Sequence, residues 1–208
     1  MPGKLLSLED QFSFYASYHR NTVNVLIHVL CVPTIFFTSL VLFHAIPGFD
    51  RPLFSVPLDL PLGLGSHSLD ATVPFLTAVG YAAYFVLLEP LAGLLYAPIL
   101  VAFGHASNVL YSDYHDAAMK LAGIAFVASW IAQFVGHGAF EGRAPALLDS
   151  LVQSLVLAVF FVWLEVLFAL GYRPDLYRRL EARTGVEVAK YRKERAQKER
   201  ERDTANAK

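Results

Sequence analysis

"TVPFLTAVGYAAYFVLLEPLAGLLYAPILVAFG", residues 72–104, is an apolar run of 33 residues that is too long for one crossing of a membrane. As a single helix it would extend for about 50 Å, whereas the apolar core of a bilayer is about 30 Å thick. Glu89 and Pro90 interrupt the run near its centre, and proline ends or kinks a helix. The run therefore predicts a hairpin of two helices, and this hairpin decides the class of fold.

Three further apolar blocks, residues 23–46, 118–140 and 151–172, are each long enough for a span of about 20 residues. Hydrophobic residues make up 55% of the 208 residues and charged residues 17%, below the roughly 25% charged residues of soluble domains. We therefore predict an all-α protein, a polytopic membrane helix bundle of about five spanning or part-spanning helices. Its length suits one compact domain.

The two ends and the first connection differ from these blocks in composition. Residues 47–71 are rich in proline and glycine, which predicts a loop. Residues 173–208 hold 12 of the 17 Lys and Arg but 7 of the 18 acids. We predict a membrane-embedded catalytic domain over residues 1–172 and a basic, partly helical tail over 173–208. The tail has few aromatic residues, so a bilayer surface is a better partner for it than nucleic acid.

The orientation in the membrane leaves two alternatives. The excess of Lys and Arg places the tail in the cytosol, and five full crossings would put the N-terminus on the opposite side. If both ends are cytosolic, one predicted span must be re-entrant, or the block at 72–104 must be counted differently.

Polar side chains recur at intervals of four within the apolar blocks. Gln133, His137 and Glu141 share one face of a helix, and so do the pairs Tyr15 with His19 and Asn24 with His28. His19 and His28 are nine residues apart, so on one straight helix they would face opposite ways. The intervening "RNT", residues 20–22, can cap a new helix. We predict an interfacial helix ending near His19, followed by a spanning helix that carries His28.

Histidine and carboxylate inside apolar helices are costly and indicate a functional site. Imidazoles with a carboxylate at Glu141 are the ligands of a non-haem Fe(II) site, while zinc, the alternative, would favour hydrolysis. His105 and His115 flank a polar connection and could serve a site at the membrane surface. A non-catalytic scaffold or lipid-binding protein, whose polar residues only join helices, stays open, as does a b-type haem protein. The clustered histidine boxes of membrane di-iron enzymes are absent from the sequence.

Two segments resemble a known family. "YASYHRNTVNVLIHVLCVP", from residue 15, and "SWIAQFVGHGAFEGRAPALLDSLVQSLVLAVFFVWLEVLFALGY", from residue 129, are similar to the yeast-type 2-hydroxy fatty acid dioxygenases, small multi-span proteins of the endoplasmic reticulum. The likeness covers roughly residues 8–178. The residues that fit the family's pattern are Tyr15, His19, Asn24, His28, Pro33, Gln133, Gly136, His137, Glu141, Pro145 and Ala146.

The resemblance implies an Fe(II)-dependent α-oxidation, in which a 2-hydroxy fatty acid and O2 give a fatty acid one carbon shorter during phytosphingosine breakdown. It implies His19, His28 and His137 as metal ligands, with His115 as a further candidate. Glu141 would be a fourth ligand or a carboxylate that orients His137. The residues that could position the substrate carboxylate are Tyr15, Asn24, Gln133 and Arg143, and the forked guanidinium of Arg143 suits two oxygens best.

Overall fold

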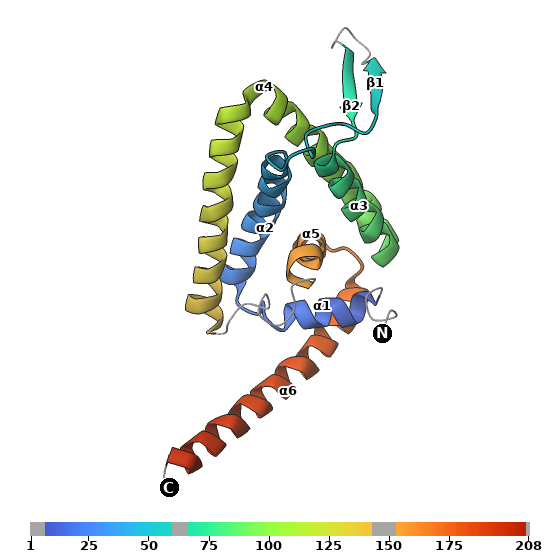
Figure 1. Cartoon of the computed structure of the whole chain (residues 1–208). Coiled ribbons are helices and arrows are strands. Elements are labelled where there is room, and N and C mark those ends of the chain that lie inside the picture. The colour runs from blue at the N-terminus through green and yellow to red at the C-terminus, as the bar shows by residue number, and fades with distance from the viewer. Residues whose placement is uncertain (1–6, 60–65, 143–152, 207–208) are drawn as a thin grey trace.

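The computed structural model describes residues 7–59, 66–142 and 153–206, and this part of the chain is mostly helical (Figure 1). Two helices in it, α2 and α4, are long and apolar enough to cross a bilayer, and α3 and α5 are shorter apolar helices. The elements are α1 (Leu8–Ala16), α2 (Thr22–Phe43), β1 (Ser55–Asp59), β2 (Ser66–Asp70), α3 (Val73–Leu88), α4 (Pro90–Gly136), the π-helical turns η3 (His137–Glu141) and η5 (Gln153–Leu157), α5 (Ala158–Ala169) and α6 (Pro174–Asn206).

The predicted break between the first two helices is confirmed. Helix α1 ends at Ala16, and α2 begins at Thr22 with Asn21 as its N-cap. The Asn21 side-chain oxygen accepts a hydrogen bond from the Val23 amide at 2.9 Å, which satisfies one of the free donors of the first turn. The chain therefore changes direction between His19 and His28.

The predicted hairpin at residues 72–104 is confirmed as α3 and the first part of α4. Glu89 is extended, with φ −147° and ψ 103°, and its carboxylate accepts from the Ala92 amide at 2.6 Å, so it caps α4. The two helices approach very closely: a Cβ atom on Gly93 would lie 2.4 Å from the Val86 backbone nitrogen. Small residues permit such contact between apolar helices.

Helix α4 joins two of the predicted blocks. Residues 105–116, expected as a polar connection, are helical up to a kink at Tyr114, where φ is −134° and ψ 30°. Figure 1 shows the helix bending back on itself there, so that its second arm runs beside α2. The blocks at 90–104 and 118–140 are thus the two arms of one bent helix.

The loop expected over residues 47–71 contains a β-hairpin, and the all-α prediction was wrong in this detail. Strands β1 and β2 are antiparallel, with Ser55 opposite Asp70 and Asp59 opposite Ser66. Proline and glycine exclude a helix here, but proline is tolerated at the edge of a sheet. In a ribbon of two strands both strands are edges, so Pro57 does not prevent the pairing.

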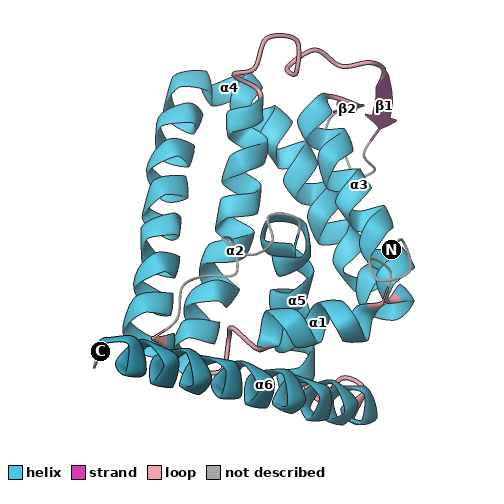
Figure 2. Cartoon of the chain, turned by 60° about the horizontal axis from the view of Figure 1, so that its bottom comes forward, coloured by secondary structure: helices cyan, strands magenta, loops and turns pink. Residues whose placement is uncertain are grey.

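Helix α5 covers only part of the height of the bundle. The Tyr81 hydroxyl, midway along α3, donates to the Leu155 carbonyl at 3.2 Å, so η5, the turn that leads into α5, lies beside the middle of α3. Tyr172, after α5, donates to Glu89 at the end of α3 at 2.7 Å. With its 12 residues α5 rises about 18 Å, less than the 22 residues of α2. Helices α1 and α6 lie at the same end of the bundle (Figures 1 and 2), and the re-entrant alternative stays a prediction.

The core at this end joins α1, α5 and α6. Phe12 packs edge-on against Phe161, with ring centroids 5.5 Å apart, and Leu180 of α6 is fully buried in the same cluster. Arg183 forms ion pairs with Glu9 and Asp10 of α1. The helical tail is confirmed, and its first turns belong to the packed core.

Candidate metal centre

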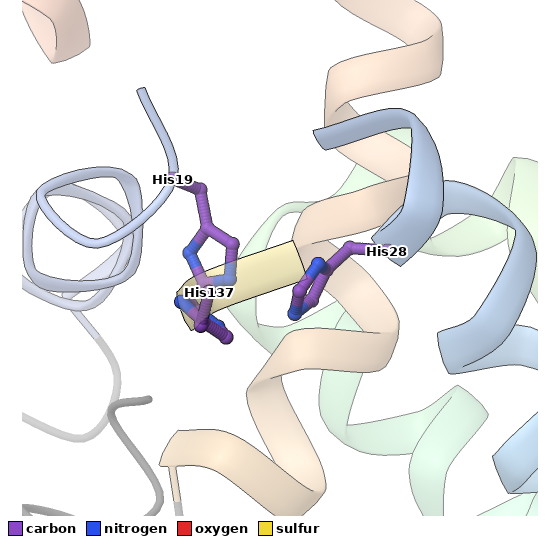
Figure 3. Close-up of side chains that lie close together, drawn as sticks. All are labelled: His19, His28 and His137. Atoms are coloured by element: carbon purple, nitrogen blue, oxygen red, sulfur yellow. The ribbon is translucent and has the colours of Figure 1, made fainter. Parts of the chain in front are cut away.

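Three histidines from separate elements meet at the end of the bundle where α1 lies. His19 follows α1, His28 lies in α2, and His137 begins η3. All three are buried, and one ring nitrogen from each lies within 4.8 Å of the others. The ring centroids are 4.4 to 4.8 Å apart, and the rings face a common space (Figure 3). Three neutral imidazoles at this separation are suited to hold a divalent transition metal.

The hydrogen bonds of two of these rings fix their tautomers. Nδ1 of His19 donates to the Tyr15 carbonyl at 2.8 Å, and Nδ1 of His28 donates to the Asn24 carbonyl at 2.9 Å. A carbonyl only accepts, so each Nδ1 carries the hydrogen and the lone pair of the ring lies on Nε2. A histidine that binds a metal through one nitrogen commonly donates from the other to a carbonyl. The site therefore fits a metal.

Tyr15 supports His19 from a second direction. Its ring stacks on the His19 imidazole, with centroids 4.0 Å apart and an interplanar angle of 18°. The Tyr15 hydroxyl is buried and has no hydrogen-bond partner among the described residues. Burial, reinforced by the nearby carboxylates of Glu165 and Glu141, raises the pKa of Tyr15 well above its usual value. The phenol is therefore a neutral hydrogen-bond donor.

Glu141 ties the end of η3 to the start of α2. Its Oε1 accepts hydrogen bonds from the Arg20 amide at 2.7 Å, the Asn21 amide at 2.8 Å and the Asn24 side-chain amide at 3.1 Å. A carboxylate at a helix N-terminus is favoured by the free amides and by the helix dipole. These bonds hold the backbone that follows His19, and the two roles expected for Glu141, as a ligand or as the carboxylate that orients His137, stay predictions.

Gly136 permits the contact between α2 and α4 that brings His28 to His137. A Cβ atom at this position would lie 2.5 Å from Oδ1 of Asn24, a fully buried side chain. Gly136 belongs to the family pattern, but its part in this contact was not predicted from the sequence. The signal that could have found it is a glycine directly before His137, since close approach of backbones needs a missing side chain.

The remaining predicted site residues fall into two groups. Gln133 lies one turn before His137, is buried, and joins Tyr15, Asn24 and Glu141 around the histidines. His115 does not lie near the three histidines. It is exposed near the kink of α4 and packs against Tyr111. It is 22 residues from His137, a separation of about 33 Å along a helix. His105 lies in the first arm of α4, also away from the cluster. Arg143 lies outside the described residues.

Comparison with known proteins assigns the chain to a family. The family model described as "2-hydroxy-palmitic acid dioxygenase Mpo1-like" matches residues 5–170. The chain belongs to the Mpo1-like family. A curated relative, the 2-hydroxy-palmitic acid dioxygenase MPO1 of Saccharomyces cerevisiae, is 38% identical over 178 residues, which cover 85% of this chain and 89% of the relative. No solved structure matches this member of the Mpo1-like family. The resemblance found in the sequence is thus confirmed.

Proposed function

We propose that this chain is an Fe(II)-dependent dioxygenase that converts 2-hydroxy fatty acids into fatty acids one carbon shorter, in the breakdown of phytosphingosine. The observation that carries the proposal is the buried group of His19, His28 and His137. The yeast relative is named for 2-hydroxy-palmitic acid, and the same class of substrate is proposed here.

Iron suits the proposed reaction better than zinc. Three histidine nitrogens are also a zinc ligand set, but zinc has no redox chemistry. When bound, Fe(II) supplies the electron transfer that O2 requires, and the Nε2 atoms of His19 and His28 are the nitrogens that would hold it. Release of the lost carbon as CO2 balances the reaction with one water, so no external reductant is needed.

The protein's own polar groups would bind the head of the substrate. The Tyr15 hydroxyl and the Gln133 amide nitrogen are buried donors without hydrogen-bond partners among the described residues. Such donors are costly to leave unsatisfied, and a carboxylate or hydroxyl oxygen of the substrate would accept from them. Arg143 is proposed for the carboxylate on the family resemblance. His19, His28 and His137 are each at most 6% exposed, so the site excludes bulk water.

A membrane of the endoplasmic reticulum is the proposed location, with both ends of the chain in the cytosol. Helices α2 and α4 are long and apolar enough to span a bilayer, and apolar side chains such as Leu30 and Leu121 are exposed on their outer faces. The basic tail favours the cytosolic side, and α1 lies at the same end as α6.

The test supplies 2-hydroxypalmitate to the detergent-purified full chain with Fe(II) under air and measures pentadecanoate. We expect a chelator to stop turnover and Fe(II), but not Zn(II), to restore it. His137→Ala should abolish the product, whereas His115→Ala, the matched control on the same helix, should retain activity. Absence of product from the wild type, or undiminished product from His137→Ala, would contradict the proposal and favour a scaffold. A Soret band would indicate haem instead.

A further inference from the structure

An apolar groove runs along α2 from Val32, which lies one turn beyond His28. It lies between α2, α3, the second arm of α4 and the η5–α5 segment, and its volume is about 160 Å³. The α2 side chains that line it include Val32, Phe36, Leu40 and Phe43. Lipid-like ligands are bound in concave apolar sites with few polar groups.

The groove adjoins a small hollow at the candidate metal centre. Trp130 and Gln133 line the groove, and the same two residues, with His137, line this hollow of about 10 Å³ beside the histidines. Gln133 and His137 are four residues apart and so lie on one face of the helix. A ligand in the groove would reach the histidines by passing Gln133.

The groove together with the step to the histidines matches the length of a long acyl chain. The groove follows α2 from Val32 to Phe43, about 16 Å along the helix axis, and His28 lies about 6 Å before Val32, so the whole path is about 22 Å. Carbon atoms about 1.5 Å apart in an all-trans chain advance about 1.3 Å each, so sixteen carbons extend for about 20 Å. Ser39, Phe43 and Thr77 line the end of the groove that lies away from the histidines.

Gln133 supplies a polar group where the groove meets the hollow. It is only 9% exposed, and its side-chain nitrogen has no hydrogen-bond partner among the described residues. A buried donor of this kind calls for an acceptor. The oxygen atoms at the head of a 2-hydroxy fatty acid are acceptors, and the rest of that molecule is apolar.

We propose that this groove holds the acyl chain of the 2-hydroxy fatty acid, with the head at Gln133 and the histidines and the methyl end at Ser39, Phe43 and Thr77. The proposal rests on the proposed function, and it adds that the far end of the groove sets the longest chain accepted. Shape and polarity favour this occupant over a bilayer lipid, because the tail of a lipid gives Gln133 no acceptor.

Photo-crosslinking tests the placement without turnover. The probes are 2-hydroxyhexadecanoic acids that carry a diazirine either at the methyl end or at the fourth carbon, added to the purified full chain without iron. We expect the methyl-end probe to label residues 39–43 or Thr77, and the other probe to label residues 130–137. Labelling of the outer face of α2 by both probes, as expected for a detergent or a bilayer lipid, would overturn the proposal.

Variants that fill the far end test its effect on chain length. Ser39→Phe and Thr77→Phe should lower kcat/KM for 2-hydroxypalmitate by about tenfold to a hundredfold, the range for a misfitted methylene, and leave 2-hydroxyoctanoate turnover intact. Leu30→Phe is the control, because Leu30 is 72% exposed on the same helix. Turnover of 2-hydroxyoctanoate shows that each variant is folded.

The results separate the two proposals. If the wild type oxidises no 2-hydroxy acid of any length, the proposed function fails, while the labelling pattern still reports on the groove. If the wild type is active but both variants keep the wild-type chain-length profile, the groove proposal fails alone.

Discussion

Gly136→Ala should weaken metal binding, because the new methyl group has no space. Its Cβ would lie 2.5 Å from Oδ1 of Asn24, whereas ordinary contacts begin at 3.4 Å, so α2 and α4 must separate by about 0.9 Å. Asn24 cannot move aside easily, because it is fully buried and its amide donates to Glu141. Overpacking costs about 1–3 kcal/mol, and the gain in helix propensity returns up to about 1 kcal/mol. The net loss in the free energy of unfolding is therefore about 0–3 kcal/mol.

The effect on the metal should exceed the effect on stability. Metal–ligand distances tolerate about 0.2 Å, and the expected displacement between His28 and His137 is several times larger. We expect the Fe(II) dissociation constant, measured by competition with a chelator, to rise about 10–100-fold, as it does when residues that support a ligand are lost. The thermal unfolding transition in detergent is recorded in parallel to show that the variant is folded.

Gly138→Ala is the matched control. It lies one residue beyond His137, and a Cβ there would have open space within 4 Å, so we expect wild-type affinity and a stability change within about 0.5 kcal/mol. The double variant Gly136→Ala with Asn24→Ala should bind Fe(II) better than the sum of the single effects predicts, since truncating Asn24 removes the obstacle. Equal affinities for the two alanine variants, or strict additivity in the double variant, would refute the steric argument.

Three further predictions concern the supports of the site and of the hairpin. Glu141→Ala should lower Fe(II) affinity, measured by competition with a chelator, about tenfold or more. Glu141→Gln keeps an acceptor for the Arg20 and Asn21 amides and should recover most of that affinity. Equal losses of affinity in the two variants would indicate that Glu141 is itself a metal ligand. Gly93→Ala should cost about 3 kcal/mol in unfolding measurements, because its Cβ meets backbone atoms that cannot rotate away. Gly80→Ala, inside α3 and with open space around its Cβ, should instead gain up to about 1 kcal/mol from helix propensity. Tyr172→Phe loses the hydrogen bond to Glu89 and should lower the free energy of unfolding by about 1–3 kcal/mol in thermal unfolding. Tyr177→Phe is its control, and a comparable loss of stability in that variant would show that the bond to Glu89 contributes little.

The elements that local rules determine were predictable from the sequence. Proline at position 90 after a capping Glu89 specifies a hairpin, and the capping residue Asn21 specifies the break between His19 and His28. The four-residue spacing placed Gln133 with His137, Tyr15 with His19 and Asn24 with His28, and the structure brings all of these residues together around the histidines.

Other features depend on contacts between distant parts of the chain. The position of η5 and α5 is set by their contacts with Tyr81 and Phe12, which no local pattern reveals. The bonds of Glu141 to residues about 120 positions earlier could not be inferred from a helical stripe. The hairpin of β1 and β2 was missed because a signal against helix does not distinguish a loop from an edge strand.

The contact of α6 with α1 makes the support of His19 depend on a segment more than 150 residues away in the sequence. His19 is held by Tyr15 of α1, and α1 is held in turn by Arg183 and Leu180 of α6. Loss of this contact would remove the packing behind His19, whereas His28 and His137 are placed by α2 and by the end of α4. A change in α6, far from the histidines, should therefore disturb the candidate metal centre first at His19.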